Sequence, residues 1–223
     1  MLAQYFKQLN QDLKQQGKAT PQLIVDAAVL QQNIQQVQQQ LAQAQHLQPR
    51  LVVKSLACLE LLKLLSAQLK TQRFMVFHQP HIITMLEHFA DADILLGKPI
   101  PAQAVFDFYA LHSAWSNAKI QWLVDTKQRL QQYLAIAQRF GICLAINIEI
   151  DVGLHRGGVQ AAAILTEILT LIQQHPQQLK FSGLMGYDAH VTKVPSIIKK
   201  PQRAYQQSQQ CYANYQQLIQ QQF

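Results

Sequence analysis

Six short apolar segments alternate with amphipathic segments between residues 51 and 222, and this alternation limits the chain to one class of fold. The apolar segments have the length and composition of buried strands, and the segments between them repeat their apolar residues at helical spacing. Strands that alternate with helices form βαβ units with parallel strands. We therefore predict an α/β protein with strands at 51–55, 74–77, 93–96, 120–125, 143–150 and 181–186 and helices at 58–68, 81–89, 102–115, 127–140, 160–174 and 202–222.

One more amphipathic helix is expected before the first strand. Asp26 is a suitable N-cap for it, and the many glutamines of this segment are expected on its solvent face. Its apolar residues share one helical face: Leu30, Ile34, Val37 and Leu41. No linker or sharp change of composition separates this helix from the rest, so we predict a single domain over residues 1–223.

Two parallel architectures are compatible with this pattern. A doubly wound sheet closes with five or six strands. A (β/α)₈ barrel needs eight strands and typically about 250 residues. The spacing of the six βα units alone does not choose between them.

The composition excludes several classes of protein. Hydrophobic residues make up 49 % of the chain and charged residues 14 %, which excludes a disordered or fibrous protein. The net charge of +7 admits a phosphate or polyanion ligand without demonstrating one. The basic stretch 193–203 is interpreted as a solvated loop, since it lacks the aromatic residues of a nucleic-acid patch. We expect no nucleic-acid partner.

The cysteines and the amino-terminal segment favour a cytoplasmic protein. Cys58, Cys143 and Cys211 are an odd number without paired spacing, so we expect reduced and mostly buried thiols. Residues 1–16 are polar and contain no apolar core of a secretory signal. No apolar run reaches the roughly 18 to 20 residues of a membrane helix, so no membrane partner is expected.

The carboxyl ends of the predicted strands hold the candidate site residues, because both parallel architectures place their chemistry there. Lys54 ends the first apolar run, where partial loss of hydration would lower the pKa of an amine and suit a Schiff-base nucleophile. A surface lysine just past a strand is the alternative interpretation.

Two further strand ends carry polar residues. The segment Asp-Val-Gly-Leu-His-Arg-Gly-Gly-Val at 151–159 combines glycines, which allow close ligand approach, with Arg156, which can donate to a phenolate, carboxylate or phosphate. Tyr187 and His190 follow the sixth strand, where they can stack on a planar ring and assist proton transfer. An ordinary glycine-rich turn and structural side chains remain the alternatives. No set of residues has the spacing of a metal site.

Taken together, these segments resemble the barrel of the fold-type III pyridoxal phosphate enzymes, the alanine racemase N-terminal family. Within that family the chain is most similar to the D-threonine aldolase and D-serine dehydratase branch. The resemblance is carried in order by Thr-Pro-Gln-Leu-Ile-Val-Asp at 20–26, Leu-Val-Val-Lys-Ser at 51–55, the segment 151–159 and Gly-Leu-Met-Gly-Tyr-Asp-Ala-His at 183–190.

The resemblance implies a function. Lys54 would form the internal aldimine with pyridoxal 5'-phosphate, and Arg156 would hydrogen-bond the ring oxygen. Tyr187 and His190 would line or stack on the pyridine face, with Lys54 and His190 as the catalytic groups. The expected enzyme is a lyase or racemase that acts at the Cα of a small D-amino acid by aldol cleavage, dehydration or racemisation. Family members commonly form homodimers, so a homodimer is possible.

The chain also departs from the family pattern. The family barrel has eight strands and is followed by a C-terminal β domain, whereas only about 33 residues follow His190 here. Strands seven and eight, the C-terminal domain and most phosphate-binding backbone are therefore expected to be absent. A divalent metal is possible in the intact family, but its ligands are not visible in this sequence. We expect one of three explanations: a fragment of a longer enzyme, a truncated gene product, or a barrel that a partner chain completes.

Other functions remain open. The single-domain pyridoxal phosphate homeostasis protein has a similar length, but the segment 151–159 fits the aldolase-like branch better. A non-catalytic cofactor-binding protein would bind the cofactor without turnover, and an inactive remnant would not bind it.

Overall fold

The computed structural model describes residues 2–44, 46–193 and 201–223. It divides the chain into two compact units, 1–47 and 48–223, so the single domain over 1–223 stays a prediction. Most of the basic stretch 193–203 lies outside the described residues. In the described part, no helix combines the length and the apolar character that a membrane crossing requires.

The first unit contains two helices, α1 (Leu2–Gln16) and α2 (Ala27–Gln43). Helix α2 confirms the helix expected around Ile34. It begins at Asp26, whose Oδ1 accepts hydrogen bonds from the backbone N–H groups of Ala28 and Val29 at 2.9 and 3.0 Å. Helix α1 was not predicted from the polar residues 1–16.

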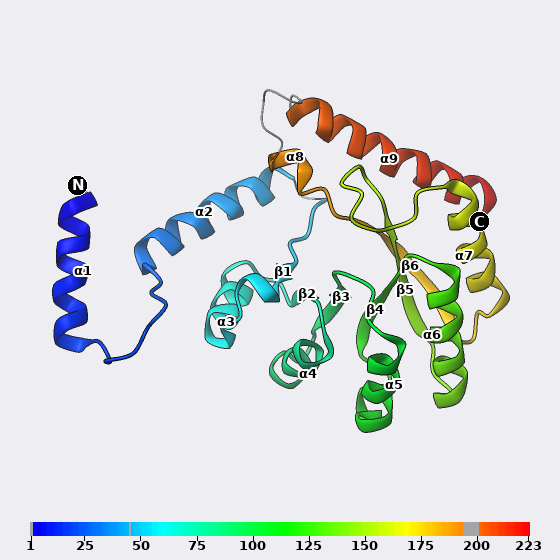
Figure 1. The fold of residues 1–223 in the computed structure, drawn as a ribbon, viewed down its shortest axis with the longest axis horizontal. Coiled ribbons are helices and arrows are strands. Elements are labelled where there is room, and N and C mark those ends of the chain that lie inside the picture. The colour runs from blue at the N-terminus through cyan, green and yellow to red at the C-terminus, as the bar shows by residue number, and fades with distance from the viewer. Residues whose placement is uncertain (1, 45, 194–200) are drawn as a thin grey trace. The chain divides into compact units, whose positions relative to one another are not determined.

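The second unit is built on one sheet of six parallel strands in the order β1-β2-β3-β4-β5-β6 (Figure 1). This consecutive order excludes the doubly wound sheet, whose strand order reverses at a switch point. Among the described residues β1 and β6 each pair with a single strand, so the sheet is an open part of a (β/α) barrel. The strands are β1 (Leu51–Val52), β2 (Arg73–Val76), β3 (Asp93–Leu96), β4 (Lys119–Val124), β5 (Leu144–Ile150) and β6 (Leu179–Gly186).

Helices follow the strands as the alternation predicts. Helices α3 to α7 lie along the outer face of the sheet (Figure 1). The expected helix 102–115 ends early at Leu111, and a 3-10 turn, Ser113–Trp115, follows it. The helices are α3 (Leu59–Gln68), α4 (Gln79–His88), α5 (Ala102–Leu111), α6 (Lys127–Phe140), α7 (Ala162–Gln174), α8 (His190–Lys193) and α9 (Pro201–Gln222).

Strand β1 is shorter than predicted. It pairs with β2 only through Leu51 and Val52. Residues Val53–Ser55 form a 3-10 turn, which the Leu56 N–H closes by donating to the Val53 carbonyl at 3.1 Å. The turn carries Lys54 out of the sheet at its carboxyl end.

Buried aromatic side chains fix the helices against the sheet. Trp122 on β4 is fully buried, and its Nε1 donates to the Tyr109 hydroxyl on α5 at 3.0 Å. The Tyr133 hydroxyl on α6 donates to the Ile100 carbonyl at 3.0 Å. Burial raises the pKa of both tyrosines to about 12, so both hydroxyls stay neutral at every physiological pH.

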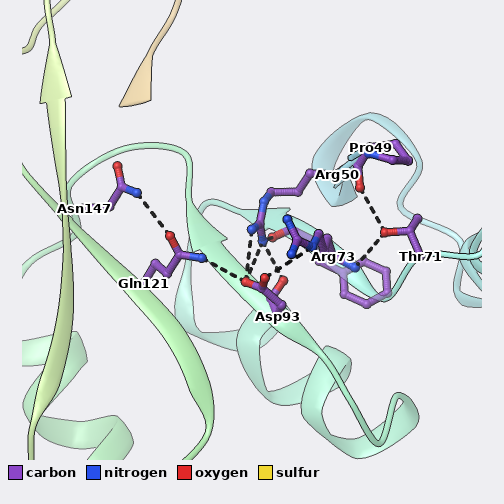
Figure 2. A network of polar contacts seen from close by, with 8 residues as sticks. Pro49, Arg50, Thr71, Arg73, Asp93, Gln121 and Asn147 are labelled. Atoms are coloured by element: carbon purple, nitrogen blue, oxygen red, sulfur yellow. Dashed lines mark hydrogen bonds and ion pairs between the residues drawn. The ribbon is translucent and has the colours of Figure 1, made fainter. Parts of the chain in front are cut away.

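A polar network crosses the amino-terminal ends of the strands (Figure 2). Arg50 donates from Nη1 and Nη2 to Asp93 Oδ1 at 3.0 Å, and Arg73 pairs with Asp93 Oδ2 at 3.6 Å. Gln121 Nε2 donates to the same Asp93 Oδ1 at 3.0 Å, and Asn147 Nδ2 donates to Gln121 Oε1 at 3.1 Å. The network therefore links residues from the start of β1 to the middle of β5.

Replacing Asp93 by alanine is expected to lower the free energy of unfolding by roughly 2 to 3 kcal/mol, because it leaves the Arg50 guanidinium without a carboxylate. Arg50 is only 17 % exposed, so water replaces little of the lost contact. Urea unfolding of the variant measures the loss. Asp91→Ala, at an exposed position two residues earlier, is the control and should change stability by less than about 0.5 kcal/mol. Equal effects of the two variants would contradict a structural role for the network.

The expectation of mostly buried cysteines is wrong. Cys58 and Cys143 are exposed and Cys211 is half-buried, and all three are free. Cys58 is the N-cap residue of α3, and Cys143 precedes the first residue of β5. Both residues flank apolar elements instead of lying within them, so the absence of paired spacing did not report their burial.

Candidate active site

The carboxyl ends of the strands border one cavity of about 680 Å³. The turn after β1 contributes Lys54, and the end of β5 contributes Glu149. Arg156 belongs to the loop 151–159, which follows β5. The structure thus brings two of the predicted site residues, Lys54 and Arg156, into the same cavity. Its further lining residues are Phe77, Lys98, Pro99, Asp125, Thr126, Arg129 and Gly157.

Lys54 reaches the cavity above an aromatic ring. Its Nζ lies 3.8 Å from the centroid of Phe77, within the range of a cation–π contact. The Phe77 ring in turn packs on Gly97, where an added Cβ would lie 2.4 Å from the ring. Lys54 itself is exposed, so the expected partial burial is not found, because the 3-10 turn lifts the residue out of the sheet.

Glu149 holds the guanidinium of Arg156. Arg156 Nη2 donates to Glu149 Oε1 at 2.7 Å, and the Glu149 side chain is only 4 % exposed. The Arg156 Cζ also lies 4.2 Å from the centroid of the Tyr187 ring. Arg156 is therefore oriented between a buried carboxylate and an aromatic face, and Tyr187 reaches the site through this contact.

Glu149 and Phe77 are contacts that the sequence analysis did not assign. A signal for Glu149 existed, because Asn147 and Glu149 alternate with apolar residues and so share one face of β5. A carboxylate on a buried strand needs a cation, and Arg156 is the nearest one downstream. Nothing in the sequence marked Phe77 as a site residue, since it belongs to an apolar segment that is typical of a buried strand.

Hydrogen bonds within the loop 151–159 fix its conformation. Asp151 Oδ1 accepts from the backbone N–H groups of Gly153 and His155 at 2.9 and 3.1 Å, and its Oδ2 lies 2.6 Å from His155 Nδ1. Burial alone would raise the pKa of Asp151, but these hydrogen bonds and the His155 ring hold that pKa below its usual value. At the end of the loop, the Val159 N–H donates to the Glu149 carbonyl at 2.8 Å.

Helix α9 forms hydrogen bonds to the same loop. Cys211 Sγ donates to the Asp151 carbonyl at 3.3 Å, and the Tyr215 hydroxyl donates to the Val159 carbonyl at 3.3 Å. These two contacts lie at the beginning and the end of the loop. The position of Arg156 therefore depends on α9 as well as on β5.

His190 lies next to Gly153 of the loop 151–159. It is the first residue of α8 and is half-buried. Its Nε2 lies 3.2 Å from the place where a Cβ on Gly153 would be, so the glycine makes room for the imidazole. Its Nδ1 is buried and has no hydrogen-bond partner among the described residues. The ring does not line the cavity that contains Lys54.

The donor set of the cavity fits pyridoxal phosphate. A primary amine can bond the carbonyl carbon, and a guanidinium that stays charged at every working pH can bind the ring oxygen. The Tyr187 ring next to Arg156 offers an aromatic face for a planar ring. In the described part of the chain, no three His, Cys, Asp or Glu side chains gather in a group that could hold a metal ion.

Comparison with protein families decides the relationship. The model of the alanine racemase N-terminal domain matches residues 25–222, which is nearly the whole chain. The chain belongs to this family. The alanine racemase N-terminal family comprises the barrels of fold-type III pyridoxal phosphate enzymes, so the predicted resemblance and the predicted barrel are both confirmed. A search of curated proteins found no significant match.

Solved structures show the same fold at low sequence identity. D-Threonine aldolase from Filomicrobium marinum matches with a TM-score of 0.69 and 20 % identity, over 89 % of this chain and 53 % of that protein. Alanine racemase from Bacillus anthracis matches with a TM-score of 0.56 and 14 % identity, over 70 % and 37 % of the two chains. Histidine racemase from Leuconostoc mesenteroides subsp. sake matches with a TM-score of 0.56 and 15 % identity, over 72 % and 42 %. The chain thus spans about half the length of these proteins or less.

The contact between Glu149 and Arg156 gives a prediction that needs no cofactor. Glu149→Gln and Arg156→Gln should each destabilise the chain, and the double variant should lose less than the sum of the two. We expect a coupling energy of roughly 1 kcal/mol, since Arg156 is 37 % exposed and partly screened by water. Urea unfolding of the four proteins measures it. Additive losses, within about 0.3 kcal/mol, would show that the two side chains do not act together.

Proposed function

We propose that this chain is the barrel part of a pyridoxal phosphate-dependent enzyme that acts at the Cα of a D-amino acid, with Lys54 as the residue that bonds the cofactor. The observation that supports it most is the shared cavity of Lys54, Arg156 and Glu149 at the carboxyl ends of parallel strands. When bound, pyridoxal phosphate supplies an electron sink for negative charge at the substrate Cα.

The residues of the chain have distinct roles in this proposal. The Lys54 amine is the nucleophile toward the cofactor carbonyl, and when free it is a base for the Cα proton. Arg156 donates to the ring oxygen, and its pairing with Glu149 fixes the direction of that donor. Tyr187 packs on the pyridine ring.

His190 is the second proton-transfer group in this proposal. Its Nε2 lies next to Gly153, and its buried Nδ1 has no hydrogen-bond partner among the described residues. We expect the His190→Gln variant to slow product formation more than it weakens cofactor attachment, because glutamine cannot carry the proton whereas Lys54 makes the bond to the cofactor.

The bond that breaks at Cα defines the reaction branch. Cleavage of Cα–H leads to racemisation or to dehydration, and cleavage of Cα–Cβ leads to an aldol-type split. The test is to incubate the full chain with pyridoxal phosphate and with D-alanine, D-serine or D-threonine in separate reactions. The respective products are L-alanine, pyruvate with ammonia, and glycine with acetaldehyde. Formation of one of them above the cofactor-only control supports the proposal.

A non-catalytic cofactor-binding protein is the second candidate. The observation that favours it is the edge strand β6, which pairs only with β5 among the described residues and leaves the barrel open. This candidate predicts covalent attachment of pyridoxal phosphate without any of these products. Absence of both attachment and product would contradict both functions.

A further inference from the structure

The cavity that contains Lys54 carries more positive charge than its ion pair balances. Four basic and two acidic side chains line it. Arg156 is balanced by Glu149 at 2.7 Å, and Lys54 is assigned to the cofactor. Lys98 and Arg129 remain, and neither forms a side-chain hydrogen bond or an ion pair with another described residue. Two unpaired cations therefore face one cavity.

Arg129 occupies a position where a cation is unfavourable for the helix that carries it. It lies in the first turn of α6, and that turn contains no acidic residue. The amino-terminal end of a helix carries partial positive charge, which repels a guanidinium and attracts an anion. Lys127 in the same turn is offset by Glu167 at 3.5 Å, whereas Arg129 has no such partner and is half-buried at the cavity. An anion bound there would remove this repulsion.

Lys98 approaches the same region from the neighbouring strand. It follows β3, and Arg129 lies just after β4, which pairs with β3 in parallel. The two loops therefore lie side by side at the carboxyl edge of the sheet. Asp125, at the end of β4, also lines the cavity and partly offsets the two cations. The three side chains together carry one net positive charge.

We infer that Lys98 and Arg129 form an oxyanion subsite at the β3–β4 side of the cavity. The subsite binds carboxylate or phosphate oxygens, through a point charge from the ammonium and a two-pronged donor from the guanidinium. The bound group is a carboxylate of the amino-acid substrate or the phosphate of the cofactor. This second step rests on the proposed function, whereas the binding of an oxyanion does not.

Calorimetric titration of the cofactor-free full chain tests the inference. Inorganic phosphate, D-alanine and D-aspartate are titrated separately in a chloride-free buffer. We expect saturable binding of at least one of them, and Lys98→Gln and Arg129→Gln should each weaken it about tenfold. Preference for phosphate identifies the cofactor phosphate as the source, and a preference for D-aspartate or D-alanine identifies a substrate carboxylate. Asp125→Asn should tighten binding, because it removes a repulsive carboxylate.

Matched controls come from the same helix. Lys127→Gln and Arg139→Gln remove one positive charge each at positions that do not line the cavity, so neither should weaken binding more than about twofold. No saturable binding up to about 10 mM of any probe would overturn the subsite, and so would equal losses in the controls. Attachment of pyridoxal phosphate to Lys54 is read separately, so failure of the proposed function is distinguishable from failure of the subsite.

Discussion

Replacing Gly158 by alanine is expected to destabilise the chain by roughly 3 to 5 kcal/mol. Gly158 has φ +95°, a backbone conformation that residues with a side chain rarely adopt. An added Cβ would lie 2.6 Å from the Ile150 carbonyl carbon and 2.7 Å from the Asp151 backbone N. These are backbone atoms at the end of the longest pairing in the sheet, so they cannot move aside.

Gly141→Ala is the matched control for this prediction. Gly141 also has a positive φ, +63°, but no atom lies within 4 Å of the added Cβ. We expect this variant to lose only about 1 kcal/mol, the ordinary cost of a left-handed alanine. Thermal and urea unfolding of both variants measure the difference. Similar losses in the two variants would show that the tight approach of Gly158 to β5 contributes nothing, and that the backbone angle alone explains both.

Replacing Lys54 by alanine is expected to abolish the covalent attachment of pyridoxal phosphate. The visible absorption band of the cofactor adduct should disappear, while stability changes by less than about 0.5 kcal/mol because Lys54 is exposed. Absorption spectra with added pyridoxal phosphate, together with urea unfolding, test both parts. The substitution changes a reactive group and little packing, so loss of the band reports chemistry and not unfolding.

Two other lysines serve as references for the Lys54 variant. Lys63 is an exposed lysine on α3 paired with Glu60 at 3.1 Å, and Lys63→Ala should leave the band unchanged. Lys98 lines the same cavity but is assigned to oxyanion binding, so Lys98→Ala should leave the band in place. A band that survives Lys54→Ala and disappears with Lys98→Ala would show that Lys98 bonds the cofactor, and would contradict the assignment of Lys54.

The strand and helix pattern was predictable because it follows from periodicity along the sequence. All six strands appear where the apolar segments place them, whereas their consecutive order in the sheet did not follow from the spacing. The shortening of β1 was not predictable, since Val53 is as apolar as Val52 and only the limited pairing with β2 separates them. The network around Asp93 was also missed, because it joins polar residues from strands that each look apolar in isolation.

The residues of the candidate site, and the strand ends near which they lie, were predictable in part. Lys54 and Arg156 meet in one cavity because the carboxyl ends of parallel strands share one edge of the sheet. The partner of Arg156 was not predicted, since the pairing with Glu149 depends on the path of the loop 151–159 back to β5. The place of His190 beside Gly153 depends on the path of the same loop, and no sequence pattern reports it.

The most direct test of the account is to identify the lysine that pyridoxal phosphate modifies. The full chain is incubated with the cofactor, reduced with borohydride, digested and mapped by mass spectrometry. The account predicts one modified peptide that contains Lys54, at close to one label per chain. Labels scattered over many exposed lysines, or a single label on another lysine, would contradict the assignment of this cavity as the cofactor site.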